Sequence, residues 1–470
     1  MFRRHKLVFA LAALTALTPG VAGSARPGPT AAAEAQVLDL SKQVIAIRSV
    51  RGPDNRTVDV AKVFKAALLA GGWADKDIEI IPYEDTAYFV ATWPGSDPSL
   101  KPLVISGHMD VVEAIPADWQ RDPFTAVVEN GYLFGRGASD TKFGDALALV
   151  ALTELREAGY KPRRTIVLEF SGDEEVSMHT SQVIAARYAN AEMVLNTDGS
   201  GGTYDTETGK PLFFAWDGAE KTYVDFKLEV TNPGGHSSAP RAENAIVQLA
   251  TALDRIGAYK FKAEQSPLTK AYFERAAQFE SDPKLAAAMR AFALNPEDAE
   301  AIATLRTSTS YVGKTGTTCV PTLLSGGHAE NALPQRATAN INCRIFPGHN
   351  RMEIMAELER VANVPQVKFT EITGGDSTET AASPMRPDFV AAVDRAMKLS
   401  WPGVPIIPTQ SSGASDSMWF RAKGVPAYGI SPIFIKDTDE FSHGLNERVQ
   451  LSNIRPGLIY YFSLFTDLSK

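Results

Sequence analysis

Hydrophobic and polar residues alternate along this chain in two different spacings, one helical and one extended. Apolar side chains recur every three or four residues at 35–47 and 58–70, which predicts two helices, the second ending at a pair of glycines. Short apolar runs at 77–82, 87–93 and 103–106 predict buried strands after them. The chain therefore starts with helices that are followed by a set of strands.

A second series of alternating elements follows the first. Residues 145–157 have the pattern of an amphipathic helix, and apolar runs at 165–170 and 193–197 predict strands with a further helix between them. Strands that alternate with helices are typical of an α/β domain with a mostly parallel sheet flanked by helices. We expect the first part of this domain at residues 35–217.

The pattern changes near residue 218, where a half-exposed strand replaces the buried runs. Helical and extended spacing then predict a strand at 223–231, a helix at 244–256, a strand pair at 317–324 and 337–346, a helix at 352–361 and a strand at 367–372. The Ala-rich residues 268–306 add two or three helices. We expect an α+β domain at 218–375, after which alternating helix and strand return at 376–470.

Length and composition fit a globular protein of more than one domain. The chain has 470 residues, of which 44% are hydrophobic and 22% charged. Its formal net charge of −8, without a Lys/Arg cluster, argues against a nucleic-acid partner.

The N-terminus has the pattern of an export signal. Arg3, Arg4 and Lys6 precede the apolar run 7–17, and small residues up to Ala25 give a cleavage point. We expect residues 1–25 to be a signal peptide and the mature protein to be periplasmic or secreted; the alternative is an uncleaved anchor. No other stretch approaches ~20 apolar residues, so we expect no stable membrane span after cleavage.

The two cysteines, Cys319 and Cys343, lie in two predicted strands around a turn. In an exported protein they could form a cross-strand disulfide. Two separate buried thiols are an equally good interpretation. Their spacing is unlike that of a zinc site.

Candidate metal ligands follow several of the predicted strands. His108 and Asp110 lie two residues apart in SGHMDVV, so their side chains leave a strand on the same side. One of them can bind a metal while the other holds the partner imidazole or faces the substrate. Asp198, in NTDG, ends another strand, and the acidic run SGDEEV contains Glu174 and Glu175. Taken alone, that run is best interpreted as a solvated acidic turn.

Two further candidates complete a mixed donor set. Asp140 lies in the Gly-rich loop GRGASDTKFGD, and His443 lies in FSHGLNERV near the C-terminus. With His108, Glu175 and Asp198 they give two imidazoles and three carboxylates, a set that suits Zn²⁺, with Co²⁺ or Mn²⁺ as substitutes. Five ligands fit two metals that share a bridging carboxylate better than one closed site.

The order of these ligands predicts how the domains are connected. Four of them lie between residues 108 and 198, and the fifth is at 443. The block at 218–375 must therefore be inserted into a discontinuous domain made of 35–217 and 376–470.

The ordered motifs resemble those of the M20 zinc metallopeptidases, from about residue 36 to the end of the chain. The motifs that carry this resemblance are SGHMDVV, GRGASDTKFG, SGDEEV, NTDG, GGHSS, AENALP and SHG. The resemblance implies a zinc-exopeptidase-like α/β domain with an inserted ferredoxin-like lid or dimerisation domain. It also implies two zinc ions per chain, one held by His108 and Asp198 and one by Glu175 and His443, with Asp140 as the bridge.

The resemblance further assigns catalytic roles to residues that bind no metal. Asp110 would orient His108, and Glu174 would be the general base. His236, in GGHSS, would stabilise the tetrahedral oxyanion; in the family this histidine often comes from a partner subunit, which implies a homodimer. From the residues alone, His236 is an ordinary turn histidine.

Substrate binding is also implied by the resemblance. Asn331, in AENALP, and Arg344, in NCRIF, would hold the substrate backbone and its terminal carboxylate. Gly413, Ala414 and Ser415 would offer backbone amides to the same anion. Two departures stand out: the helices at 268–306 lengthen the lid, and VSMHTS follows Glu175 where many relatives have a Gly-Ser-rich turn.

The sequence thus predicts an exported di-zinc metallopeptidase that hydrolyses short peptides. The alternative is an N-acyl-amino-acid deacylase with the same site. A non-catalytic binding protein is disfavoured because all five candidate ligands and Glu174 are present. A serine α/β-hydrolase is disfavoured because no G-x-S-x-G motif occurs.

Overall fold

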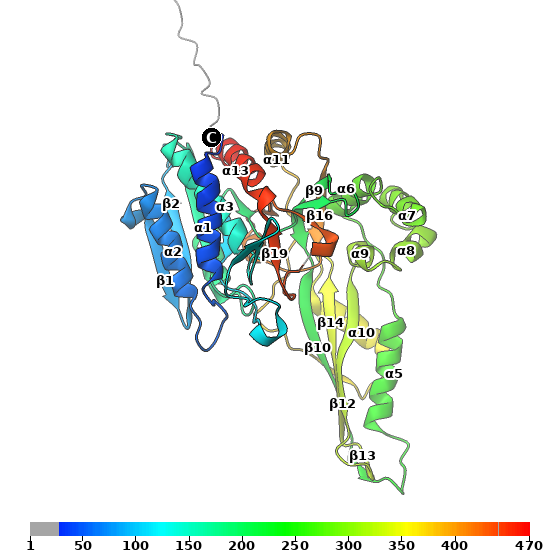
Figure 1. The fold of residues 1–470 in the computed structure, drawn as a ribbon. Helices are drawn as coiled ribbons and strands as arrows, with labels where there is room; N and C mark the ends of the chain where they lie inside the picture. The colour runs from blue at the N-terminus through cyan, green and yellow to red at the C-terminus, as the bar shows by residue number, and fades with distance from the viewer. Residues whose placement is uncertain (1–27, 440) are drawn as a thin grey trace, which may run out of the picture.

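A computed structural model describes residues 28–439 and 441–470 of the chain. The predicted signal peptide, residues 1–25, lies outside the described residues. Figure 1 shows a broad layered body, from which an elongated unit of strands and helices projects.

A large sheet forms the centre of the broad body. Its strands run in the order β1-β2-β6-β3-β7-β17-β9-β8-β18, and β16 also pairs with β9. The four neighbours β6, β3, β7 and β17 are parallel to one another. The strands are β1 (Ile78–Tyr83), β2 (Thr86–Trp93), β3 (Leu103–His108), β6 (Ile166–Ser171), β7 (Met193–Asn196), β8 (Gly202–Tyr204), β9 (Pro211–Glu220), β16 (Ile406–Ser411), β17 (Ala427–Gly429) and β18 (Phe434–Lys436).

Helices cover both faces of this sheet, as a buried parallel sheet requires. The main hydrophobic core lies under five of them: α1 (Ala31–Ile45), α2 (Thr57–Ala70), α3 (Lys142–Glu157), α11 (Pro387–Ser400) and α13 (Ile454–Leu468). A smaller core on the other face lies under α4 (His179–Arg187) and α12 (Ser417–Ala422). The predicted fold class, an α/β protein with a mostly parallel sheet flanked by helices, is confirmed. None of the described helices is long and apolar enough to cross a membrane.

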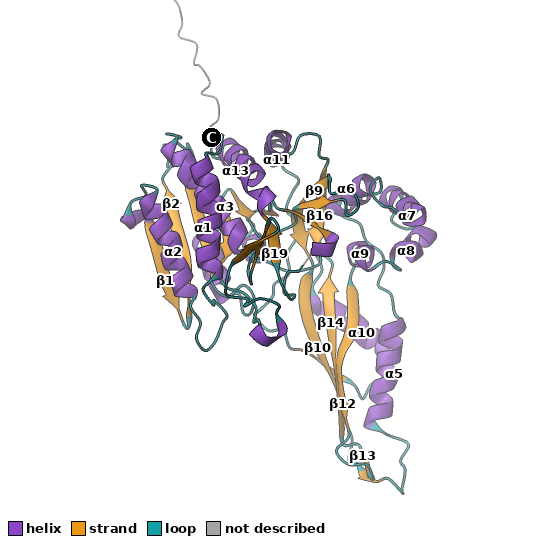
Figure 2. Ribbon diagram, in the orientation of Figure 1, coloured by secondary structure: helices purple, strands orange, loops and turns teal. Residues whose placement is uncertain are grey.

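The projecting unit is a four-stranded antiparallel sheet in the order β12-β14-β10-β15 (Figure 2). Residues on β10 alternate between buried and half-exposed, so one face of the sheet packs on helices and the other is polar. The unit has a hydrophobic core of its own. It consists of β10 (Thr222–Thr231), α5 (Ala245–Ala258), β12 (Thr318–Gly326), β14 (Arg336–Ile345), α10 (Arg351–Ala362) and β15 (Lys368–Glu371). Its role as a lid or dimerisation domain stays a prediction.

The Ala-rich helices pack on the large sheet although they lie inside the 218–375 block. They are α6 (Pro267–Ala276), α7 (Pro283–Leu294), α8 (Ala299–Leu305) and α9 (Thr309–Val312). Phe273 and Phe292 from these helices share a hydrophobic cluster with Ile407 of β16. Figure 1 shows the helices beside β9 and β16. The exact domain boundaries stay a prediction.

Cys319 and Cys343 form a disulfide between β12 and β14, where they are direct cross-strand partners. The structure therefore decides between the two interpretations of the cysteines in favour of the bridge. A separate three-stranded sheet joins the loop before α3 to the C-terminal region. Its strands are β4 (Val127–Glu129), β5 (Tyr132–Phe134) and β19 (Arg448–Gln450).

Candidate active site

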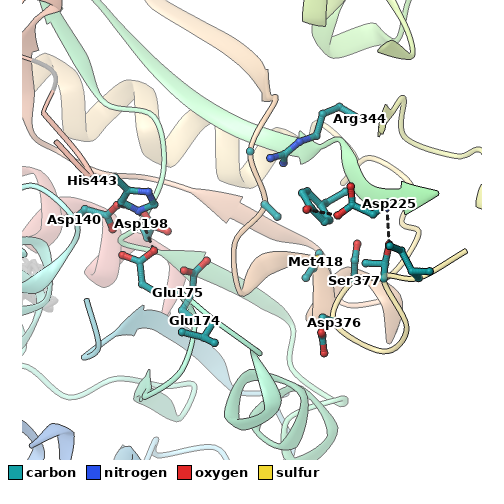
Figure 3. Close-up of a pocket in the computed structure, with 16 residues that line it drawn as sticks. Asp140, Glu174, Glu175, Asp198, Asp225, Arg344, Asp376, Ser377, Met418 and His443 are labelled. Atoms are coloured by element: carbon teal, nitrogen blue, oxygen red, sulfur yellow. Dashed lines mark hydrogen bonds and ion pairs between the residues drawn. The ribbon is translucent and has the colours of Figure 1, made fainter. Parts of the chain in front are cut away.

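Several predicted site residues meet at one edge of the large sheet. His108 is the last residue of β3, Glu174 and Glu175 follow β6, and Asp198 follows β7. Because these strands are parallel, their carboxyl ends lie at the same edge, where open α/β sheets place their sites. Asp140, in the loop before α3, and His443, in the loop before β19, complete the cluster (Figure 3).

His108 is buried and aimed at the acidic residues. Its Nδ1 lies 3.1 Å from the backbone oxygen of Asp110 and 3.6 Å from the carboxylate Oδ1 of the same residue. Its Nε2 lies 3.0 Å from Asp140 Oδ1 and 4.0 Å from Asp198 Oδ2. The backbone contact fixes the ring, so that Nε2 faces the two carboxylates.

Asp140 lies between the two imidazoles. Its Oδ1 faces His108, and its Oδ2 lies 3.2 Å from Nε2 of His443. The same His443 nitrogen lies 2.9 Å from Oε2 of Glu175. A carboxylate with one oxygen toward each imidazole has the geometry of a bridging ligand.

The carboxylates create a strongly negative region. Burial and the charge of Asp140 raise the pKa of Asp198 well above its ordinary value. The hydrogen bonds to Asp140 and Glu175 raise the pKa of His443 to about 10. Although burial lowers the pKa of His108, its bonds to Asp110 and Asp140 outweigh burial and raise it. The carboxylates therefore stabilise a positive charge placed between them.

This donor set fits a metal ion. The potential ligand atoms of His108, Asp140 and Glu175 all lie within 4.8 Å of one another, and Asp198 is within reach of His108. Imidazole nitrogen and carboxylate oxygen together suit zinc and its neighbours among the divalent metals. The described residues thus include a His/Asp/Glu group able to hold metal.

The acids of the SGDEEV run are turned in different directions. Asp173 is buried and accepts hydrogen bonds from the backbone N–H groups of His179 and Thr180, at 2.8 and 2.9 Å, at the start of α4. Glu175 faces His443, while Glu174 is 8% exposed and lines the open cavity. Burial raises the pKa of Glu174 well above its ordinary value. Of these three acids, Asp173 and Glu175 are held by the contacts above, and Glu174 faces the cavity.

Asp110 holds the acidic run as well as His108. Its carboxylate is buried and accepts hydrogen bonds from the backbone N–H groups of Glu174, at 3.1 Å, and Glu175, at 3.0 Å. It thus fixes both of these residues relative to His108.

Glu447 is a site residue that the sequence analysis missed. It is completely buried, and it accepts hydrogen bonds from the backbone N–H groups of Ser139, at 2.7 Å, and Asp140, at 3.1 Å. It also forms a buried ion pair with Arg136 at 2.8 Å. Glu447 therefore ties the Asp140 loop to the loop of His443. Its position, four residues after His443, was the only signal in the sequence.

A cavity of about 600 Å³ extends from these carboxylates toward the projecting unit. Arg344 of β14 lies in its wall, with the guanidinium 4.7 Å from the ring centre of Tyr223 and Nη1 3.3 Å from the backbone oxygen of Ser412. Gly413 and Ala414 line the same cavity. Ser415 does not: it is 6% exposed and its hydroxyl donates to the carboxylate of Glu220.

Two predicted site residues lie elsewhere, at the far tip of the projecting unit. His236 is exposed in the short strand β11 (Gly235–His236), which pairs with β13 (Ala332–Leu333). Asn331 is exposed just before β13, and its backbone oxygen accepts a hydrogen bond from Ser237 N at 2.9 Å. Neither lines the cavity of its own chain as the structure describes it. Figure 1 shows β13 at the end of the projection.

Known proteins are similar in sequence to this chain over most of its length. The model of Peptidase family M20/M25/M40 matches residues 104–467. "Probable carboxypeptidase S-like 2" of Dictyostelium discoideum is 26% identical over 403 residues, which cover 81% of this chain and 74% of that protein. Human "N-fatty-acyl-amino acid synthase/hydrolase PM20D1" is 27% identical over 401 residues, which cover 80% and 76%.

Solved structures of low sequence identity share the fold. The M20 family metallo-carboxypeptidase Sso-CP2 from Sulfolobus solfataricus has a TM-score of 0.69 and 17% identity, with 92% of this chain and 98% of that chain covered. Human carnosine dipeptidase 1 has a TM-score of 0.61 and 16% identity, with 94% and 100% covered. Because the family model matches well over half of the chain, this chain belongs to Peptidase family M20/M25/M40 and is a metallo-hydrolase.

Proposed function

We propose that this protein is an exported di-zinc metallopeptidase that hydrolyses amide bonds of short peptides. The observation that carries this proposal is the position of Asp140, which turns one carboxylate oxygen to His108 and the other to His443. Glu174, a carboxylate outside that set, lines the adjoining cavity.

The proposed ligands divide into two groups around Asp140. His108 and Asp198 would hold one zinc ion and Glu175 and His443 the other, while Asp140 would bind both. Co²⁺ or Mn²⁺ would be a possible substitute. Bound zinc supplies a Lewis acid that polarises the substrate carbonyl and lowers the pKa of water.

Glu174 would carry the proton through the reaction. It accepts a proton from the attacking water while the water oxygen forms a bond to the carbonyl carbon. As the C–N bond breaks, Glu174 gives the proton to the departing amine. The burial that raises its pKa makes it a stronger base for the first of these transfers.

Arg344 would bind the terminal carboxylate of the substrate through its planar guanidinium. Its stacking on Tyr223 and its bond to Ser412 O hold it in the cavity wall. The backbone amides of Gly413 and Ala414 lie in the same cavity and would assist.

A second copy of the chain would complete the site. His236 and Asn331 lie together at the exposed tip of the projecting unit, away from their own cavity. We therefore propose a homodimer in which the tip of one copy brings His236 to the oxyanion and Asn331 to the substrate backbone of the other.

Export is proposed from the N-terminal pattern and from the disulfide. Arg3, Arg4 and Lys6 before an apolar run are typical of a signal peptide. The Cys319–Cys343 bridge suits an oxidising compartment such as the periplasm or the cell exterior.

A deacylase of N-acyl amino acids is the second candidate. It would use the same ligands and the same base, and PM20D1 and mouse "Aminoacylase-1", 25% identical over 402 residues, are among the similar proteins. The test is a panel of dipeptides, blocked peptides and N-acyl amino acids with the zinc-loaded mature protein. We expect dipeptides to be hydrolysed. Cleavage of N-acyl amino acids alone would favour the deacylase, and no cleavage of any substrate would refute both.

A further inference from the structure

A second cavity, of about 340 Å³, opens on the same carboxylates from another direction. Asp140 and Asp198 line both this cavity and the larger one that contains Arg344. The two cavities therefore meet at the proposed metal ligands. A substrate with its amide bond at these residues would extend into both of them.

The wall of the second cavity comes from several separate parts of the chain. The Gly-rich residues 199–202, which follow Asp198 directly, line the part next to the metal ligands. Phe213 of β9 and Ile433, which directly precedes β18, add apolar surface. Tyr272 and Lys314 come from the helical segment 267–315, which packs on that sheet. This segment is therefore part of a binding cavity.

Lys314 is the cation of this cavity, held in a defined position. Its Nζ donates hydrogen bonds to Thr409 Oγ1 at 3.0 Å and to the backbone oxygen of Gln410 at 2.8 Å. It lies 4.6 Å from the ring centre of Tyr272. A lysine ammonium has three N–H groups, so one remains beyond these two bonds.

A carboxylate that attracts Lys314 already accepts hydrogen bonds from another residue. Asp217 interacts with Lys314 electrostatically, but its oxygens accept hydrogen bonds from the backbone N–H and the hydroxyl of Ser200. None of the described carboxylates forms an ion pair with Lys314. The lysine is thus available to an anion that enters the cavity.

We propose that the second cavity binds the acyl side of the substrate and that Lys314 selects acyl groups ending in a carboxylate. The inference rests on the proposed function. Arg344 in the larger cavity would hold the carboxylate of the amine side, so the part on the other side of the amide bond occupies the second cavity. Its apolar walls suit a short carbon chain, and Lys314 suits an acidic end, as in an N-terminal glutamyl residue.

Paired substrates test this inference on the zinc-loaded mature protein. Glu-Leu and Gln-Leu differ only in the charge of the acyl-side chain, as N-succinyl-leucine and N-butanoyl-leucine differ in a terminal carboxylate. We expect kcat/KM to be higher for the acidic member of the hydrolysed pair. Replacing Lys314 with Met should lower the ratio of kcat/KM, acidic over neutral, by roughly 10- to 100-fold, as expected for a lost hydrogen bond between charged groups.

Two variants separate charge recognition from a structural role. Lys314→Arg keeps the cation and should retain part of the preference for the acidic substrate. Lys270→Met is the matched control, because Lys270 lies on the exposed face of α6 and pairs with Glu274; it should leave the ratio unchanged. The ratio for the unmutated protein remains a test even if Lys314→Met fails to fold.

A ratio of one or less for the unmutated protein, or an unchanged ratio in Lys314→Met, would overturn the inference while leaving the proposed function intact. Absence of hydrolysis of all four substrates would instead count against the proposed function, and the inference would fall with it.

Discussion

The buried carboxylate of Glu447 accepts a hydrogen bond from the backbone N–H of Asp140 at 3.1 Å. These residues are 307 positions apart in the chain. The contact joins the loop of the proposed bridging ligand to the loop that carries His443. The position of Asp140 between the two imidazoles is thus supported by a residue outside the proposed set of metal ligands.

Replacing Glu447 with Gln should weaken zinc binding by roughly 10- to 100-fold, the usual effect of losing a group that orients ligands. The substitution removes a charge that faces Arg136 and the N–H groups of Ser139 and Asp140. Competition with a chelator measures the affinity. Glu129→Gln, which breaks an exposed pair with Arg121, is the control and should bind zinc normally. Equal affinities for the two variants would contradict this role.

Replacing Glu174 with Gln should reduce turnover by at least roughly 100-fold without loss of metal, because the amide cannot accept the proton of water. Zinc content should stay near two per chain, since Glu174 lines the cavity outside the proposed ligand set. Activity and metal analysis on the same sample check both statements. Retained turnover would show that another group is the base.

Several residues of the site could be predicted because they lie at the ends of strands. Apolar runs predicted β3 and β7, so His108 and Asp198 could be expected at one edge of the sheet, and the structure brings them within 4.0 Å. The different directions of Asp173 and Glu175 could not be predicted. They depend on which backbone N–H groups each carboxylate meets, and this is decided by the start of α4.

The packing partners of the Ala-rich helices could not be predicted from the sequence either. Helical spacing shows that α6 and α7 each have an apolar face, but not which surface that face covers. Phe273 and Phe292 pack toward Ile407 of the large sheet, although their neighbours in sequence lead into the projecting unit. Ser415 follows the cavity residues Gly413 and Ala414 directly, yet its side chain is buried beside Glu220.

Mixing two inactive variants tests the homodimer. His236→Ala should lower kcat more than it raises KM, because an oxyanion donor acts mainly in the transition state. If His236 acts across the interface, a refolded mixture of His236→Ala and Glu174→Gln regains activity, since one site of each heterodimer has both native groups. No recovery, with heterodimers demonstrated, would show that His236 acts within its own chain or has no catalytic role.

Removing the disulfide should destabilise the projecting unit. Cys319 and Cys343 are 24 residues apart, a separation for which a bridge contributes about 2–4 kcal/mol. The double replacement by Ala should lower the urea midpoint, and a reductant should have a similar effect on the unmutated protein. A reductant that does not change the midpoint would contradict a stabilising bridge.

Metal removal should make stability depend on pH. Burial and the charge of Asp140 raise the pKa of Asp198, so the folded metal-free protein binds that proton more tightly than the unfolded chain. Its free energy of unfolding should therefore fall as pH rises above about 4 toward the folded pKa. Urea titrations of the metal-free protein at about pH 5 and about pH 8 measure this fall. Asp198→Asn should reduce it, and an equally steep fall in that variant would assign the effect to other groups.

The most direct test of the di-zinc hydrolase is a zinc titration of the metal-free protein, with dipeptide hydrolysis as the readout. We expect hydrolysis to appear with added zinc and to reach its maximum at about two zinc ions per chain, the number that a bridging Asp140 implies. Maximum activity at one ion per chain, or no hydrolysis of any dipeptide or N-acyl amino acid at saturating zinc, would contradict a di-zinc hydrolase.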